Sequence, residues 1–215
     1  MDSKYNYSYT GDEKYCYPGT NILRNKRNIK DSNILSHFER TMTSLRQREL
    51  FSNPIIGNFD LEHLKEIHRY LFSDVFEWAG EIRKVNIAKT DLFCLTNNIN
   101  TYADEIFNKL KKDNYLQNLN KETFVIKIAE LLGDINALHP FREGNGRAQR
   151  EFIRYIAGIN GYGLDFSKIS EEENIVASHE SINGDNTNLE LIISKILFEL
   201  DKEVTVKLRR YFKIK

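Results

Sequence analysis

A polar, glycine-bearing segment between two apolar helical patterns is the feature that most constrains this chain. Residues 139–150 read His-Pro-Phe-Arg-Glu-Gly-Asn-Gly-Arg-Ala-Gln-Arg. Before it, apolar residues recur at three- and four-residue steps from Phe124 to Leu138, which is the core face of a helix. After it, the helical period resumes from Ala148 to Ile156. The segment therefore predicts a loop that closes at the N-terminus of a helix.

Such a loop is suited to binding a phosphate. The free N–H groups and the positive dipole end at a helix start attract anions. Gly144 and Gly146 let the backbone approach a ligand and tolerate the positive φ values of an anion-binding nest. Arg147 and Arg150 lie three residues apart on one predicted helical face, so both guanidinium groups can reach one polyphosphate.

Two further residues of the segment indicate chemistry at that phosphate. Glu143 would repel an anion unless a divalent cation lay between them, and Mg²⁺ held by one carboxylate, phosphates and water is the usual solution. His139 can accept a proton near neutral pH. A base, a metal-binding carboxylate and a phosphate cradle together predict nucleotidyl or phosphoryl transfer.

Residues 139–150 resemble the signature of the Fic (filamentation induced by cAMP) domain family, His-Pro-Phe-x-Asp/Glu-Gly-Asn-Gly/Lys-Arg-x-x-Arg, at every fixed position. The resemblance implies a mainly α Fic fold, a helical bundle around the motif with one β-hairpin flap. It covers 15–200, with the flap at 81–95 and the motif at 139–150. We expect an N-terminal arm at 1–14 and a C-terminal helical extension at 201–215. Four further segments look like parts of Fic domains: Tyr17–Asn21, Leu61–Phe72, Trp78–Arg83 and Asp134–Leu138.

The resemblance implies an ATP-dependent protein adenylyltransferase. His139 would deprotonate a Tyr, Thr or Ser hydroxyl of a target protein, which then attacks the α-phosphate of ATP and releases pyrophosphate. Glu143 would coordinate Mg²⁺. The expected nucleotide-binding residues are Gly144, Asn145 and Gly146 at the α- and β-phosphates, Arg147 along the phosphate chain and Arg150 at the γ-phosphate. Glycine at position 146 favours AMP transfer, because a family member with lysine there is a kinase.

The resemblance also implies partners. Fic enzymes are commonly inhibited by a glutamate in a Ser/Thr-x-x-x-Glu-Gly/Asn helix, which pairs with the second motif arginine, here Arg150. The chain lacks this pattern, and Ser170 to Glu173 is explained as a helix capping box. We therefore expect a small separate antitoxin that supplies the glutamate; the alternatives are an unregulated enzyme and control by self-association. Free-standing bacterial relatives modify the ATPase subunits of type II topoisomerases, and secreted relatives modify small GTPases. The resemblance favours a topoisomerase subunit as the target but does not identify it.

The segment from Arg83 to Leu95 carries the clearest strand pattern. Residues alternate along 82–88, a turn follows at 89–91, and an apolar run returns, which predicts a β-hairpin. A lone hairpin leaves an edge to which a target segment could add as a strand. A hairpin that merely caps the helical core is the alternative. The docking flap is assigned to Arg83, Val85, Ile87 and Ala88, and further nucleotide contacts to Lys89, Thr90, Leu92 and Phe93.

Other patterns predict helices. Asp31 or Ser32 begins one that stops before Asn53, and Asp60 begins the next, on which His63 and His68 lie five apart and do not form a metal pair. Ile99 to Leu110 marks another. Capping-box patterns at Ser170 with Glu173 and at Thr187 with Glu190 predict two more, the last continuing through Leu200 into the basic C-terminus.

Composition limits the class of protein. The chain has 215 residues, which suits one domain, and a formal net charge of zero, which gives no general attraction to nucleic acid or to an anionic membrane. Two cysteines and no long apolar run favour a cytoplasmic protein. Transfer of another phosphate-containing group, a kinase-like reaction, AMP removal and a non-catalytic nucleotide- or anion-binding module remain as alternatives.

Overall fold

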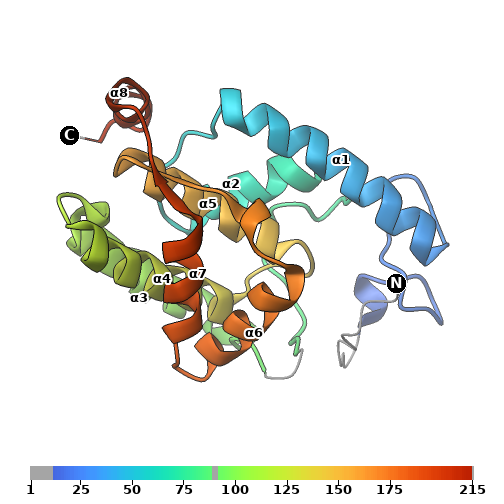
Figure 1. Ribbon diagram of the computed structural model, residues 1–215. Coiled ribbons are helices and arrows are strands. Elements are labelled where there is room, and N and C mark those ends of the chain that lie inside the picture. The colour runs from blue at the N-terminus through green and yellow to red at the C-terminus, as the bar shows by residue number, and fades with distance from the viewer. Residues whose placement is uncertain (1–11, 89–91, 215) are drawn as a thin grey trace.

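Helices make up most of the computed structural model, which describes residues 12–88 and 92–214 (Figure 1). The mainly α fold predicted from the sequence is confirmed. The α-helices are α1 (Ser32–Ser52), α2 (Leu61–Phe72), α3 (Ile99–Lys112), α4 (Lys121–Leu138), α5 (Asn145–Ile159), α6 (Glu171–Ile182), α7 (Thr187–Ile196) and α8 (Lys202–Tyr211). Short 3₁₀ turns lie at Asp12–Lys14, Thr96–Asn98, Asn114–Leu116 and Phe166–Lys168.

The predicted helix starts agree with the structure at three positions. Asp31 accepts hydrogen bonds from the N–H groups of Asn33 and Ile34, both at 2.9 Å, and Asp60 accepts one from His63 at 2.8 Å. Ser170 and Glu173 form the reciprocal bonds of a capping box. The second predicted box is wrong. Thr187 is already the first residue of α7. Its N–H donates to the carboxylate of Asp185 at 2.9 Å, so the side chain that serves the start of this helix is Asp185 and not Thr187.

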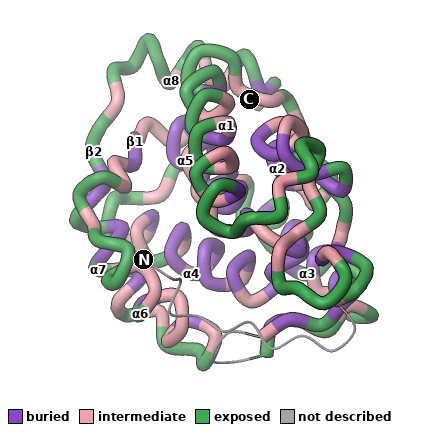
Figure 2. The backbone as a smooth tube through the Cα atoms, turned by 90° about the vertical axis from the view of Figure 1, so that its right-hand side faces the viewer, coloured by how far each residue is buried: buried purple, intermediate pink, exposed green. Residues whose placement is uncertain are grey.

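The core is built around α4. It packs against α3, α5, α6 and α7, and α5 packs in turn against α2 and α8. Figure 2 shows α4 as largely buried, whereas the outer face of α1 is exposed. Because α4 ends at Leu138 and α5 begins at Asn145, the two most enclosed helices present the motif loop between them.

The segment at 81–95 differs from the predicted hairpin. Its described residues hold one isolated antiparallel bridge, between Ala88 and Leu92, in place of a ladder. Cys94 N–H donates to the carbonyl of Ala137 at 3.0 Å, and Val85 and Ile87 are buried. The segment is thus fastened to the end of α4 and to the core, which competes with pairing between its own two halves.

The only strands among the described residues lie elsewhere. β1 (Tyr162–Leu164) and β2 (Leu197–Glu199) pair antiparallel, with Gly163 opposite Phe198. Leu197–Glu199 was predicted to be helical. The helix stops at Ile196, because the chain there runs alongside the segment that leaves α5.

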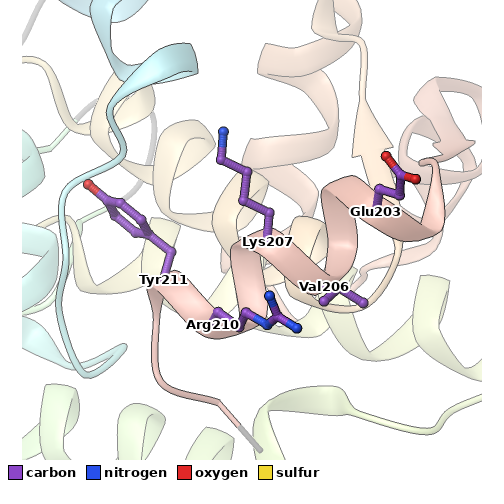
Figure 3. Close-up of a pocket in the computed structure, with 5 residues that line it drawn as sticks. All are labelled: Glu203, Val206, Lys207, Arg210 and Tyr211. Carbon is purple, nitrogen blue, oxygen red and sulfur yellow. The ribbon is translucent and has the colours of Figure 1, made fainter.

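The C-terminal helix α8 is a separate element that returns to the core. Leu208 packs over Gly158 of α5, and Arg209 Nε donates to the carbonyl of Ile159 at 2.7 Å. Phe212 is 5% exposed. The opposite face of α8 carries a surface pocket of about 510 Å³, lined by Glu203, Val206, Lys207, Arg210 and Tyr211 (Figure 3).

That pocket is remote from the motif loop. The loop meets the N-terminal end of α5 and α8 meets its C-terminal end, and a helix of 15 residues is roughly 20 Å long. Along the described parts of the chain, none of the helices has the length and apolar character that crossing a bilayer requires.

Truncating Phe212 should destabilise the fold. Its ring lies 5.0 Å from the ring of Phe59 and 5.2 Å from that of Tyr155. We expect Phe212→Ala to lower the free energy of unfolding by about 3–5 kcal/mol, measured by urea denaturation. The neighbouring Tyr211 is 36% exposed, so Tyr211→Ala is the matched control and should cost much less. Equal losses for the two variants would contradict the packing described for α8.

Candidate active site

His139 lies where α4 ends. It is the C-cap residue of α4 in the left-handed conformation, with φ 43° and ψ 59°, and its N–H still donates to the carbonyl of Ile135 at 3.1 Å. The ring stacks on Phe93 with 3.7 Å between centroids and an interplanar angle of 17°. The stacking on Phe93 therefore fixes the plane of the imidazole.

The hydrogen bonding of His139 is compatible with the role of a base. Its Nδ1 lies 3.2 Å from the carbonyl oxygen of Asn136. A carbonyl only accepts, so this contact favours the tautomer with the proton on Nδ1, and Nε2 then carries the lone pair that a base needs.

Arg83 fastens the first part of the motif loop. Its Nε donates to the carbonyl of His139 at 2.8 Å, and its backbone N–H donates to the carbonyl of Pro140 at 2.9 Å. The guanidinium also donates to the carbonyls of Val85 and Cys94. Burial lowers the pKa of Arg83 to about 10, which still leaves it charged near neutral pH. One buried cation thus joins the loop to both halves of the segment at 81–95.

His68 supports the loop from α2. Its Nδ1 accepts from Gly80 N–H at 2.8 Å, so Nε2 is the protonated nitrogen, and it donates to the carbonyl of Glu143 at 2.9 Å. The ring stacks on Phe141 with 3.9 Å between centroids. Complete burial lowers the pKa of His68 to about 3. His68 therefore has a structural role, and so does His63, which is 2% exposed and bonds to the carbonyl of Ile55 at 2.8 Å.

Asn145 closes the loop on itself. Its side-chain oxygen accepts from Phe141 N–H at 2.9 Å, and its Nδ2 donates to the carbonyl of Phe141 at 2.8 Å. The side chain is therefore committed to the protein, and only the backbone N–H of Asn145 is placed to serve a ligand. Phe141 is fully buried.

The two glycines of the motif have different roles. Gly144 has φ 81°, and a Cβ at this position would lie 2.2 Å from the ring of Phe72. Gly146 belongs to the first turn of α5 and does not adopt a positive φ. A Cβ there would lie 3.3 Å from Nη1 of Arg150, so glycine at 146 keeps space in front of that guanidinium.

Arg147 is held by residues outside the motif. Its guanidinium pairs with the carboxylate of Glu39, Nη1 donates to Oγ1 of Thr43 at 3.2 Å, and Cζ lies 4.7 Å from the centroid of the Phe72 ring. Burial raises the pKa of Glu39; the charge of Arg147 opposes this shift, and that of Glu143 adds to it. The two carboxylates therefore lie close enough to interact.

Arg150 lies one turn further along α5. Its guanidinium carbon is 5.8 Å from the centroid of the Phe166 ring. Burial lowers the pKa of Arg150, the charge of Arg147 lowers it further, and Glu171 at the start of α6 opposes the shift. The two motif arginines thus repel each other through space, as expected of a site built to receive an anion.

Glu143 is the residue that could hold a metal ion. It is half-buried, and its Oε1 accepts from the N–H of Gly144 at 3.0 Å. Within residues 12–88 and 92–214, no group of three or more potential metal ligands occurs. A cation here would need its remaining ligands from phosphate oxygens and water, and that ligand set suits Mg²⁺.

The residues assigned to the flap differ in how far they are exposed. The side chains of Arg83, Val85 and Ile87 are buried, so they cannot serve as docking surface, whereas Lys84 and Asn86 between them are exposed. Phe93 is buried against His139, whereas Leu92 is 56% exposed. Lys89 and Thr90 lie outside the described residues. Ala88 is half-buried beside the bridge to Leu92.

Several residues of the site were missed by the sequence analysis. Glu39 and Thr43 contact Arg147 from α1, and Asp12 forms an ion pair with the buried Arg142 of the motif. The polar pair at 39 and 43, four residues apart on an otherwise amphipathic helix, is the one signal that could have drawn attention. Asp12 carries no such signal.

Comparisons with known proteins agree with this geometry. The profile of the Fic/DOC family matches residues 58–157. The chain is 37% identical over 188 residues to "Probable protein adenylyltransferase y4lH" of Sinorhizobium fredii, covering 86% of this chain and 96% of that protein. It is 38% identical over 189 residues to "Protein adenylyltransferase VbhT" of Bartonella schoenbuchensis, covering 87% of this chain but only 40% of the length of VbhT.

A solved structure has the same fold. The structure of BepC, a VirB-translocated effector protein of Bartonella tribocorum, contains bound AMPPNP and superposes with a TM-score of 0.82. The sequences are 27% identical, and the match covers 88% of this chain and 98% of that one.

Protonation of His68 should destabilise the protein in acid. Its pKa is about 3 in the folded state against an ordinary 6.5, so the unfolded chain binds the proton first and stability falls as the pH drops below about 6.5. One such group contributes at most about 1.4 kcal/mol per pH unit. Burial shifts the pKa of His63 in the same direction.

Urea denaturation between pH 7.5 and 5.0 measures this dependence. His68→Asn removes one titrating group and should reduce the slope, whereas His37→Asn, at an exposed position of α1, should not. An unchanged slope in the His68→Asn variant would mean that His68 does not carry the effect.

Proposed function

Because the chain belongs to the Fic/DOC family, we propose that it is a protein adenylyltransferase that transfers AMP from ATP to a hydroxyl side chain of a target protein. The observation that carries the proposal is the intact motif loop, held between His139 at the end of α4 and the first turn of α5. The AMPPNP bound to BepC and the names of the relatives support a nucleotide co-substrate and this reaction class.

His139 acts as the general base. With Nδ1 bonded to the carbonyl of Asn136, Nε2 takes the proton from the target hydroxyl. The hydroxyl oxygen forms a bond to the α-phosphorus, the bond from that phosphorus to the bridging oxygen breaks, and pyrophosphate leaves. Phe93 and the left-handed cap conformation of His139 keep the imidazole oriented through this step.

The start of α5 binds the phosphates. The N–H groups of Asn145 and Gly146 lie in its first turn, where a helix has no carbonyl partners for them. Arg147 binds along the phosphate chain and Arg150 at the γ-phosphate. Glu143 would hold Mg²⁺, which would neutralise phosphate charge. We assign further contacts with the nucleotide to Leu92, Lys89 and Thr90. The backbone around Ala88 is assigned to docking of the target segment.

Control by a partner is part of the proposal. Arg150 already interacts with one carboxylate, that of Glu171, whose negative charge raises the pKa of Arg150 and so favours the charged guanidinium. A small antitoxin-like protein that brings a glutamate to Arg150 would compete with the γ-phosphate. The type II topoisomerase subunit as target and the cytoplasmic location stay predictions.

Loss of the base should abolish most of the transfer but not nucleotide binding. His139→Ala is expected to reduce labelling of a target from α-³²P-labelled ATP with Mg²⁺ in bacterial lysate by about 10²–10⁴-fold. The protein should still bind ADP in a calorimetric titration. His37→Ala, on the exposed face of α1, is the control and should label like the wild type.

The position of the radiolabel separates the competing reactions. Label that depends on His139 and comes from α-labelled but not γ-labelled ATP is expected for AMP transfer. Label from γ-labelled ATP would indicate a kinase-like reaction. Equal labelling by the wild type and His139→Ala would reject the assignment of His139 as the base.

A further inference from the structure

Two side chains of α1 contact a motif arginine although α1 lies outside the motif. The carboxylate of Glu39 pairs with Arg147, and the side chains of the two residues are 14% and 21% exposed. Thr43, one helical turn later, is 2% exposed, and its hydroxyl oxygen accepts from Nη1 of Arg147 at 3.2 Å. More than a hundred residues separate Thr43 from this arginine in the sequence.

The contacts define the plane and the position of the guanidinium. The hydroxyl of Thr43 donates to the carbonyl of Glu39 at 2.8 Å, which directs its lone pairs away from the helix axis and toward Arg147. The ring of Phe72 lies against the guanidinium, with 4.7 Å between its centroid and Cζ. An arginine has five N–H donors, and the contacts with Arg147 among the described residues employ Nη1 and Nη2. On that part of the chain, Nε and further hydrogens remain for a ligand.

We propose that Glu39 and Thr43 are positioning residues that hold Arg147 ready for the β-phosphate of the nucleotide. The inference rests on the proposed function, since it assumes that Arg147 binds the phosphate chain. An arginine side chain has many rotamers, and fixing it before the ligand arrives removes that ordering cost from the binding step. The residues that position Arg147 lie on α1 and α2, outside the motif.

The burial of the pair argues against the opposite role, in which Glu39 withholds Arg147 from the nucleotide. Releasing the arginine would leave the Glu39 carboxylate buried without its cation and close to Glu143. An unpaired buried charge is strongly unfavourable. A nucleotide is therefore expected to use the remaining donors of Arg147 while the pair with Glu39 stays intact.

Thr43→Val tests the proposal without changing any charge. In the full-length chain with Mg²⁺, we expect calorimetry to show ADP binding about tenfold weaker, the effect of one hydrogen bond to a charged group. Binding of AMP, which lacks the β-phosphate, should change by less than about threefold. Thr41→Val is the matched control, because the Thr41 hydroxyl makes the same type of bond to the helix, to the carbonyl of His37 at 2.9 Å, but does not contact Arg147.

A double-mutant cycle shows whether Thr43 and Glu39 act through Arg147. In an Arg147→Ala background, neither Thr43→Val nor Glu39→Gln should weaken ADP binding further. A structural defect alone would lower affinity in both backgrounds. Thermal melting of each variant reports folding independently.

The outcomes separate this inference from the proposed function. If the wild type binds neither ADP nor ATP, the proposed function fails. If it binds ADP and Thr43→Val binds as tightly as Thr41→Val, the positioning role is wrong. If Glu39→Gln binds ADP more tightly than the wild type, α1 restrains Arg147, which also overturns the proposal. The proposal is supported if Thr43→Val and Glu39→Gln each weaken ADP binding in the wild-type background and neither weakens it further in the Arg147→Ala background.

Discussion

The motif loop is a buried stretch of backbone, and its carbonyl and N–H groups must find partners inside the protein. Arg83 serves the carbonyls of His139 and Pro140, Asn145 serves both polar groups of Phe141, and His68 serves the carbonyl of Glu143. These partners come from three different parts of the chain. The loop can therefore be irregular and still rigid, which is the condition for holding a base and a phosphate cradle in register.

Local sequence patterns predicted what depends on local structure. Apolar periodicity identified α4 and α5, and the side-chain caps at Asp31, Asp60 and Ser170 are confirmed. The motif alone indicated a loop at a helix start, and the structure has that arrangement. The resemblance to Fic domains supplied the function and most of the site residues, which the spacing of residues could not have assigned.

The errors concern contacts between distant segments. Alternation along 82–88 predicted a hairpin, but alternation reports only which side chains are buried. Here Arg83, Val85 and Ile87 are buried, and Arg83 bonds to the motif loop. Arg83 looked like a surface residue because arginine usually is one. The contacts of Glu39 and Thr43 with Arg147 span more than a hundred residues, and no local pattern records such a pairing. The strand β2 was missed for the same reason, since its partner β1 follows another helix.

The packing of Phe212 also has a consequence for the order in which the chain can fold. Phe59 and Phe212 are in ring contact although they are about 150 residues apart in the sequence. This contact is therefore among the most non-local in the molecule. During synthesis, the ribosome delivers residue 212 long after α2 and α5 have emerged. Until then the aromatic cluster around Phe59 and Tyr155 is open on one side, and the nascent chain exposes apolar surface that can associate with other chains.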